Sequence, residues 1–189
     1  MDRGQTVLLY AAVMSGLLFL ALAFFAVAQA ATVRNGGQSA ADAAALAAAR
    51  EDRDRFFDGF LDSLGEGDGW QRWLDLSELV SADGCGAAGD FAGRNDASVL
   101  RCEPVFRHGR PGYTVTVETN YDTGNTVIPG ADDRTATAEA TAVVRPSCEF
   151  DAEEKEIELD CKNGDFDIDP DDEEIDVEPS DLFSVVLTE

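Results

Sequence analysis

The segment "GGQSAADAAALAAAR", residues 36–50, decides how the rest of the chain is organised. Alanine is the best helix former because its side chain loses no conformational entropy, so the segment predicts a helix. Alanine buries little area, and such a helix gains little from an ordinary hydrophobic core. Small side chains instead allow one helix to approach another closely. The sequence therefore predicts helix-packing positions at Ala40, Ala41, Ala44, Ala45 and Ala48.

An uncharged segment precedes the alanine-rich one and extends from Gln5 to Val33. Its core reads "TVLLYAAVMSGLLFLALAFFAVAQAAT". A run of about 20 apolar residues is enough to span a bilayer. We therefore predict a transmembrane helix over residues 5–33, with residues 1–4 as a cytoplasmic tail.

A cleaved secretory signal is the alternative interpretation of this segment. Ala28-x-Ala30 resembles a cleavage site and would leave Ala31 as the first residue of a secreted protein. Signal peptides have apolar regions of only about 7–15 residues, and this one is longer, which favours a retained anchor. The distribution of Lys and Arg does not favour a cytoplasmic N-terminus. The four cysteines do favour it, because they fit a C-terminal domain in an oxidising, extracytoplasmic compartment.

Beyond the membrane, residues 34–64 are predicted to form an alanine-rich and then amphipathic helix. The glycines in "RNGG", residues 34–37, predict a break or kink where this helix begins. Its second part carries an apolar face that is expected to pack on the chain's own domain, and a partner-binding face is the alternative. That face consists of Phe56, Phe57, Phe60, Leu61 and Leu64.

Residues 65–189 are expected to form an exported domain with an antiparallel sheet. The segments 113–121 and 134–145 alternate between apolar and polar residues, which predicts a hairpin with a long loop. Shorter strands are predicted in "EIELDC" and in "DLFSVVLT", and a short helix or turn in "WQRWLDLSELV". The predicted fold class is therefore α+β, a long N-terminal helix followed by a small β-rich domain.

The four cysteines predict two disulfide bonds. Four cysteines allow three pairings, and the sequence favours bonds between neighbours, Cys85–Cys102 and Cys148–Cys161. Cys85 and Cys102 are expected to flank a glycine-rich loop. A zinc site is the alternative, but zinc ligands are usually spaced C-x₂₋₄-C and neither pair has that spacing.

Residues 149–181 contain seventeen acidic residues against two lysines. Four of the acids alternate along the chain and would share one side of a strand, which makes them weak candidates for calcium binding. They are Asp165, Asp167, Asp169 and Asp171. The spacing does not fit an EF-hand loop, because the sixth position is Pro170 and not glycine. A solvated acidic segment is the favoured interpretation.

The net charge of −24 limits the classes of partner. Nucleic-acid binding needs a basic face, and electrostatic docking on anionic lipid needs clusters of Lys and Arg, so neither is expected. The chain contains no G-x-S-x-G elbow, no P-loop and no dinucleotide fingerprint. We therefore expect neither an enzyme nor a cofactor.

The N-terminal third resembles the TadE/TadG-like proteins of the Flp (Tad) pilus assembly system. The resemblance covers about residues 2–50: "DRGQ", an uncharged span, and then "ATVRNGGQSAADAAALAAA". It implies an envelope protein with a long N-terminal helix, an exported C-terminal domain and pilin-like helices as partners. The alanine-rich helix would then pack on those helices; a simple linker helix is the alternative.

The start of the chain shows one departure from pilin-like sequences. A prepilin peptidase would cut between Gly4 and Gln5, and pilin-like sequences usually have Glu at the fifth position after the cut. That position is Leu9 here, so no carboxylate is present to pair with a neighbour's amine. The sequence therefore favours an anchored accessory role over that of a major fibre subunit. The alternative function is a surface-displayed acidic binding module on a membrane tether.

Overall fold

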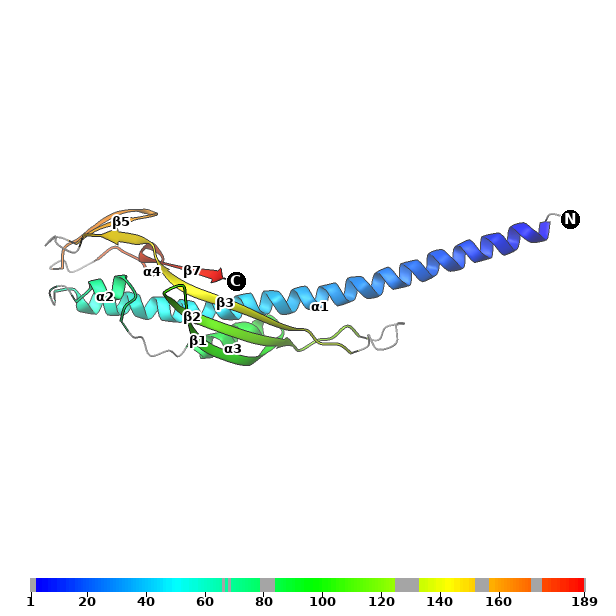
Figure 1. Ribbon diagram of the computed structural model, residues 1–189, viewed down its shortest axis with the longest axis horizontal. Coiled ribbons are helices and arrows are strands. Elements are labelled where there is room, and N and C mark those ends of the chain that lie inside the picture. Colours follow the sequence, from blue (N-terminus) through cyan, green and yellow to red (C-terminus); the bar gives the residue numbers. More distant parts are fainter. Residues whose placement is uncertain are drawn as a thin grey trace.

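One helix runs through most of the length of the molecule (Figure 1). In the computed structural model, helix α1 extends without interruption over Arg3–Ser63, 61 residues and about 90 Å. The prediction of a break at residues 34–37 is therefore wrong. The structure describes residues 3–65, 67, 69–78, 84–124, 133–151, 157–170 and 175–188.

The glycines at positions 36 and 37 serve close packing rather than a break. A Cβ atom on Gly36 would overlap the Tyr121 hydroxyl oxygen, and one on Gly37 would lie 3.3 Å from side-chain carbons of Thr119 and Ala136. These glycines therefore let a β-hairpin lie directly against α1. Their cost in helix propensity, about 1 kcal/mol each, is borne in a helix that is supported by tertiary contacts.

A four-stranded antiparallel sheet packs along the C-terminal part of α1. Its strands are β1 (Ala97–Arg107), β2 (Arg110–Thr119), β3 (Thr137–Pro146) and β7 (Phe183–Thr188), in the order β1-β2-β3-β7. The predicted hairpin is confirmed as the antiparallel pair of β2 and β3. Val115 and Val117 are fully buried against the helix side, as their alternation with threonines predicts.

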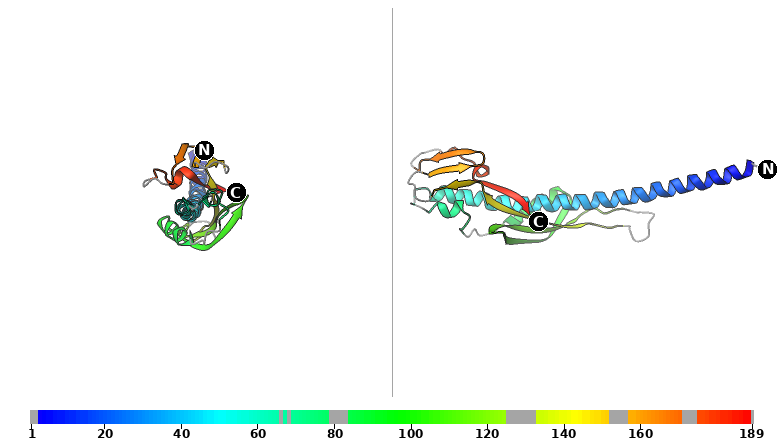
Figure 2. Two further views of the ribbon diagram at one scale, coloured as in Figure 1. Left: turned by 90° about the vertical axis from the view of Figure 1, so that its left-hand side faces the viewer. Right: turned by 45° about the horizontal axis from the view of Figure 1, so that its top comes forward.

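Helix α3 (Gly84–Arg94) lies beside α1 and next to strand β1. The prediction of a glycine-rich loop between Cys85 and Cys102 is wrong, because this region forms α3 and the first part of β1. Both elements contain residues that disfavour their secondary structure. Helix α3 has four glycines in it or at its start, and strand β1 contains Pro104. In end view the helices and strands gather around the axis of α1 (Figure 2).

A second, three-stranded sheet lies at the end of α1 that is farthest from the N-terminus. Its strands are β4 (Cys148–Phe150), β5 (Ile157–Cys161) and β6 (Gly164–Ile168), in sequence order. Strand β5 confirms the strand predicted in "EIELDC". Trp70, just before the short helix α2 (Gln71–Leu74), packs edge-on against Phe150 at 5.1 Å and joins this sheet to the core.

Two further predictions concern the ends of this domain. The apolar face of α1 packs inside the domain, as predicted, with Phe56, Phe57 and Phe60 buried. The predicted strand in "DLFSVVLT" begins two residues late, because its first two residues close the short helix α4 (Pro179–Leu182). The α+β fold class is confirmed.

Candidate functional site

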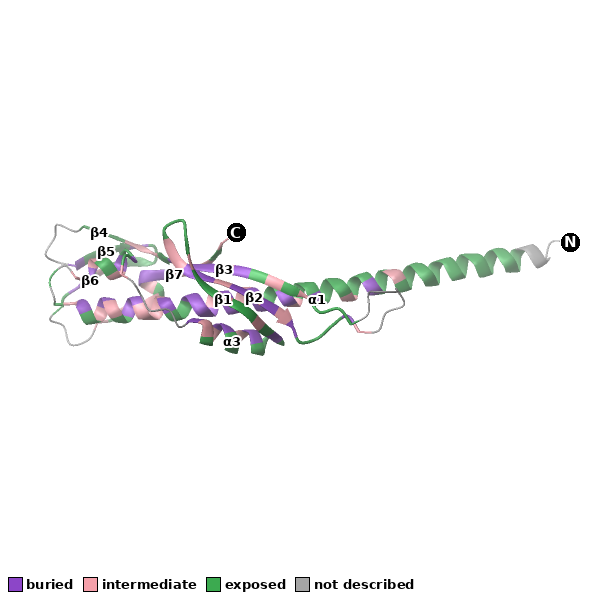
Figure 3. Cartoon of the chain, turned by 60° about the horizontal axis from the view of Figure 1, so that its bottom comes forward, coloured by how far each residue is buried: buried purple, intermediate pink, exposed green. Residues whose placement is uncertain are grey.

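The N-terminal part of α1 is uncovered on every side. Residues 6–25, which we call the projecting half, are exposed at every position except Ala23, which is partly covered (Figure 3). The exposed side chains include Leu8, Leu18, Phe19 and Phe24, each more than 60% exposed. A helix that is apolar all round needs an apolar environment, either a protein core or a membrane. This is the single helix in the described part of the chain that is long and apolar enough to cross a membrane.

The length of the projecting half matches a bilayer. Its 20 residues span about 30 Å at 1.5 Å per residue, which equals the thickness of a typical hydrocarbon core. No charged residue occurs in it. The chain therefore has one N-terminal helix that could form a single membrane span.

Cover by the chain's own domain begins directly after this half. Along α1, buried positions appear at Ala26, Val33, Gly37, Ala40 and Ala44. Their spacings of seven, four, three and four residues place them on one face of the helix. This face then continues into residues 37–63, which we call the packed half.

The five alanines predicted for helix packing are all in the packed half and are 0% exposed. They lie in the domain's own core, where α1 meets β2, β3 and α3. These alanines are therefore covered by the chain's own elements, α3 among them, and packing on helices of other proteins stays a prediction. Helix α3 approaches the backbone of α1 closely, because a Cβ on Gly84 would overlap the carbonyl oxygen of Ala48.

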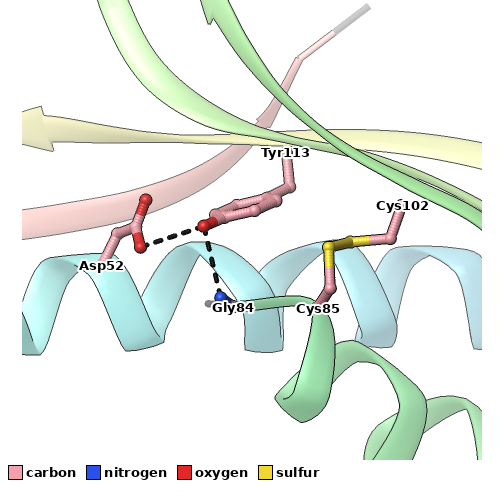
Figure 4. The surroundings of a disulfide bond; sticks show 5 residues. All are labelled: Asp52, Gly84, Cys85, Cys102 and Tyr113. Atoms are coloured by element: carbon pink, nitrogen blue, oxygen red, sulfur yellow. Dashed lines mark hydrogen bonds between the residues drawn. A yellow bond between two sulfur atoms is a disulfide. The ribbon is translucent and has the colours of Figure 1, made fainter. Parts of the chain in front are cut away.

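A buried polar cluster links α1, β2 and the start of α3 (Figure 4). The Tyr113 hydroxyl donates a hydrogen bond to Oδ1 of Asp52 (3.1 Å) and accepts one from the amide N–H of Gly84 (3.2 Å). Burial raises the pKa of the Asp52 carboxyl above its usual value, although the bond from Tyr113 opposes this. Burial also raises the pKa of Tyr113 to about 12. The cluster therefore fixes three elements through one phenol group.

The sequence analysis did not identify this cluster, although a signal for it exists. Asp52 follows Ala45 by seven residues and Ala48 by four, so it continues the alanine face of the helix. A carboxylate on a buried face needs a hydrogen-bond donor, because burying it alone is costly. The identity of the donor, Tyr113, depends on the register of β2 and could not be read from sequence.

Both disulfide bonds join the partners that the sequence favoured. Cys85–Cys102 ties the first turn of α3 to β1, beside the polar cluster (Figure 4). Cys148 and Cys161 lie directly opposite each other on β4 and β5. No cysteine of the chain is free.

The outer face of the three-stranded sheet is acidic. Glu149, Asp160 and Asp165 are paired across the three strands, and Glu158 is paired with Asp167 in the next row. All five are exposed. Like charges directly opposite each other destabilise a sheet, and mobile cations in the solvent reduce that cost.

The structure places the candidate calcium ligands as follows. Asp165 and Asp167 share the outer face of β6, Asp169 is exposed after the end of that strand, and Asp171 lies outside the described residues. Within the described ranges, no three Asp, Glu, His or Cys side chains come together as a metal site. Calcium binding stays a prediction.

The proposed processing site, Gly4–Gln5, lies in the first turn of α1, and the positions of its side chains are outside the described part of the structure. Processing there stays a prediction. Comparison with known families, with curated proteins and with solved structures gives no significant match.

Proposed function

We propose that the chain is a membrane-anchored accessory component of a Flp/Tad-type pilus assembly system, with its C-terminal domain outside the cytoplasm. The observation that supports this most is the continuity of α1. The helix that is apolar on all sides passes into the domain without a break and forms the centre of its core. This arrangement agrees with the long N-terminal helix and exported domain that the TadE/TadG-like resemblance implies.

Continuity of the helix has a mechanical consequence for such a component. A flexible linker would let the domain rotate freely relative to the membrane anchor. Here the anchor and the core are parts of one rigid element, so a neighbouring helix that binds the projecting half also fixes the orientation of the domain. Assembly contacts in the membrane would therefore determine how the acidic sheet is presented.

The two disulfide bonds support the proposed orientation. Disulfides persist in oxidising compartments and are rare in the cytosol. Both bonds lie in the C-terminal domain, and the N-terminal side of α1 contains no cysteine. Leu9 occupies the position at which pilin-like sequences usually have Glu. The missing carboxylate supports an accessory role over that of a major fibre subunit.

A surface-displayed acidic binding module is the second candidate function. It is supported by the outer face of the three-stranded sheet, which presents five exposed carboxylates on paired positions. In that case the projecting half would act only as a tether. Cations or cationic partners would bind the acidic face.

An exchange of the membrane anchor separates these two functions. Residues 6–25 are replaced by a polyleucine helix of the same length, which preserves the span and the helical register of everything beyond Phe25. The variant is expressed in the source cell in place of the native protein, and pili are counted by electron microscopy. The pilus proposal predicts loss of pili although the variant reaches the membrane with both disulfides formed.

The matched control tests the other candidate. Asp160, Asp165 and Asp167 are changed together to Asn, which keeps the shape of the acidic face and removes three charges. The pilus proposal predicts normal pili in this variant. Normal pili with the polyleucine anchor would contradict the proposal, and failure of the triple Asn variant alone would favour the binding module.

A further inference from the structure

The hairpin formed by β2 and β3 extends along α1 toward the N-terminus, past the rest of the sheet (Figure 1). Backbone pairing continues beyond the ends of the two strands. Thr123 donates its amide N–H to the carbonyl of Arg134 (3.1 Å), and Asp133 donates to the carbonyl of Gly124 (3.3 Å). The end of the hairpin is therefore an ordered part of the domain up to this pair.

Two buried hydroxyl groups hold this extension in place. Thr119 accepts the amide N–H of Ala136 (3.0 Å) and donates to the carbonyl of Tyr121 (2.7 Å). Thr123 accepts the amide N–H of Arg134 (3.2 Å). Both threonines are less than 10% exposed. The bonds to Ala136 and Arg134 take the place of backbone ladder bonds and join the two arms of the hairpin beyond the ends of β2 and β3.

The contacts of Thr119 and Ala136 with Gly37 fix the position of the hairpin along α1, because both side chains are short. Gly37 is twelve residues beyond Phe25, the last residue of the projecting half, which corresponds to about 18 Å. The five residues from Thr119 to Gly124 cover about 16 Å in the opposite direction. The pair of Gly124 and Asp133 therefore lies about 2 Å, measured along α1, from the end of the projecting half.

The headgroup layer of a bilayer is about 5–8 Å thick on each side of the hydrocarbon core. If the projecting half fills the hydrocarbon core, this layer begins at Ala26 and contains the hairpin end. We propose that Gly124 and Asp133, the outermost described pair of the β2–β3 hairpin, contact the lipid headgroups and hold the domain against the membrane surface. This inference rests on the proposed membrane anchor.

The charge of the hairpin end limits the kind of lipid that it can contact: Asp122 and Asp133 lie beside Arg134, so zwitterionic headgroups fit this end and anionic headgroups do not. The segment 149–181 contains seventeen acidic residues, and its strands β5 and β6 lie in the three-stranded sheet at the opposite end of the domain. The projecting half and the helix turns next to it contain no acidic residue up to Asp42. The acidic end is thus held far from the bilayer, where repulsion by anionic lipids is screened.

Paramagnetic relaxation in nanodiscs tests the contact without altering the hairpin. The full chain is placed in phosphatidylcholine nanodiscs that contain lipid with a nitroxide on its headgroup, and broadening of backbone amide signals is measured. We expect strong broadening at Gly124 and Asp133. Gly65, at the far end of α1 and about 60 Å from Phe25, should show none. Broadening at Gly124 and Asp133 no greater than at Gly65 would overturn the inference.

A second nitroxide separates this inference from the proposed anchor. Lipid labelled at the end of its acyl chain should broaden the amide of Leu17, in the middle of the projecting half. Broadening at Leu17 without broadening at Gly124 would support the membrane anchor and contradict the contact of the hairpin with the headgroups. No broadening at Leu17 means that the anchor itself is wrong.

An insertion variant tests whether the length of α1 determines how close the hairpin lies to the bilayer. Seven polar helix-forming residues are inserted between Phe25 and Ala26, which lengthens α1 by about 10 Å and rotates the domain by only about 20°. Every contact within the domain is kept. If helix length sets the distance of the hairpin from the bilayer, broadening at Gly124 should fall steeply, while broadening at Leu17 is unchanged. Undiminished broadening at Gly124 would show that the length of α1 does not determine the distance between the hairpin and the bilayer.

Discussion

The projecting half of α1 and the alanine-rich stretch of its packed half, residues 40–49, are both largely apolar, but their side chains are of opposite size. The projecting half exposes Leu and Phe residues in every direction, whereas the packed half buries alanines completely. Lipid tails adapt to any shape, so large side chains gain contact there at no cost in fit. A sheet and a second helix are rigid, and only small side chains let their backbones come close. Small side chains on α1 therefore mark where the sheet and α3 approach its backbone closely, whereas Phe56 and Phe60 fill the wider space farther along the helix.

Enlarging a side chain in the packed half should have the largest effect. Ala44→Leu adds volume at a fully buried position and is expected to lower the free energy of unfolding by about 3 kcal/mol. Urea unfolding of the full chain in detergent, followed by the fluorescence of Trp70 and Trp73, measures this. The matched control is Ala12→Leu in the projecting half, where the change should stay within about 0.5 kcal/mol. Equal effects in the two halves would refute the comparison.

Removing a tyrosine hydroxyl distinguishes the halves in a second way. Tyr113→Phe leaves the Gly84 amide without its acceptor and the Asp52 carboxyl without its donor, so we expect a loss of about 2 kcal/mol. Tyr10→Phe removes a hydroxyl from an exposed residue of the projecting half and should leave the unfolding of the domain unchanged. The same urea titrations compare the two variants. A neutral Tyr113→Phe would show that the cluster does not fix α3.

Gly16 in the projecting half and Gly36, next to the packed half, should respond differently to substitution by alanine. At Gly16 an added Cβ meets nothing, so Gly16→Ala should be neutral or improve helix stability by up to about 1 kcal/mol. At Gly36 the Cβ would overlap the Tyr121 hydroxyl oxygen, and Tyr121 must move. We expect Gly36→Ala to lose that gain and to shift the Tyr121 ring resonances in NMR spectra. Unchanged Tyr121 resonances would contradict the contact.

The smallest predicted effect is a pH dependence confined to the packed half. Because burial raises the pKa of Asp52, the folded state binds a proton there more tightly than the unfolded state does. This group therefore favours folding at acid pH, and its contribution is lost as the pH rises from 3.8 through the raised pKa. Asp52→Asn should flatten the dependence of unfolding free energy on pH in that window. An unchanged slope relative to the native chain would contradict the raised pKa.

Sequence patterns predicted the parts of the fold that depend on periodicity. The uncharged run, the alternation in β2 and β3 and the apolar face around Phe60 each appear in the structure as expected. The disulfide partners also followed from sequence order. The site that these elements build was only partly predicted: the long apolar helix was recognised, but the burial of the alanines in the chain's own core was not, because a small-residue face does not specify what it contacts.

The two wrong predictions, a helix break at residues 34–37 and a loop between Cys85 and Cys102, have the same physical cause, which is tertiary contact. Gly36 and Gly37 are helix breakers by propensity, yet α1 continues through them because the hairpin packs on them. Helix α3 forms in spite of its glycines because it is held by the Cys85–Cys102 bond and by the approach of Gly84 to Ala48. In both places the partner comes from a distant part of the chain, and local sequence contains no record of it.

Mapping of lipid contacts along α1 tests the central claim most directly. The full chain is placed in nanodiscs at one molecule per disc, with lipid that has a photoreactive diazirine in its acyl chain, and crosslinked residues are identified by mass spectrometry. We predict crosslinks on all faces of residues 6–25 and none in the packed half. Crosslinks confined to one face of residues 6–25, or crosslinks at the alanines between 40 and 48, would contradict the claim that one helix has these two surroundings.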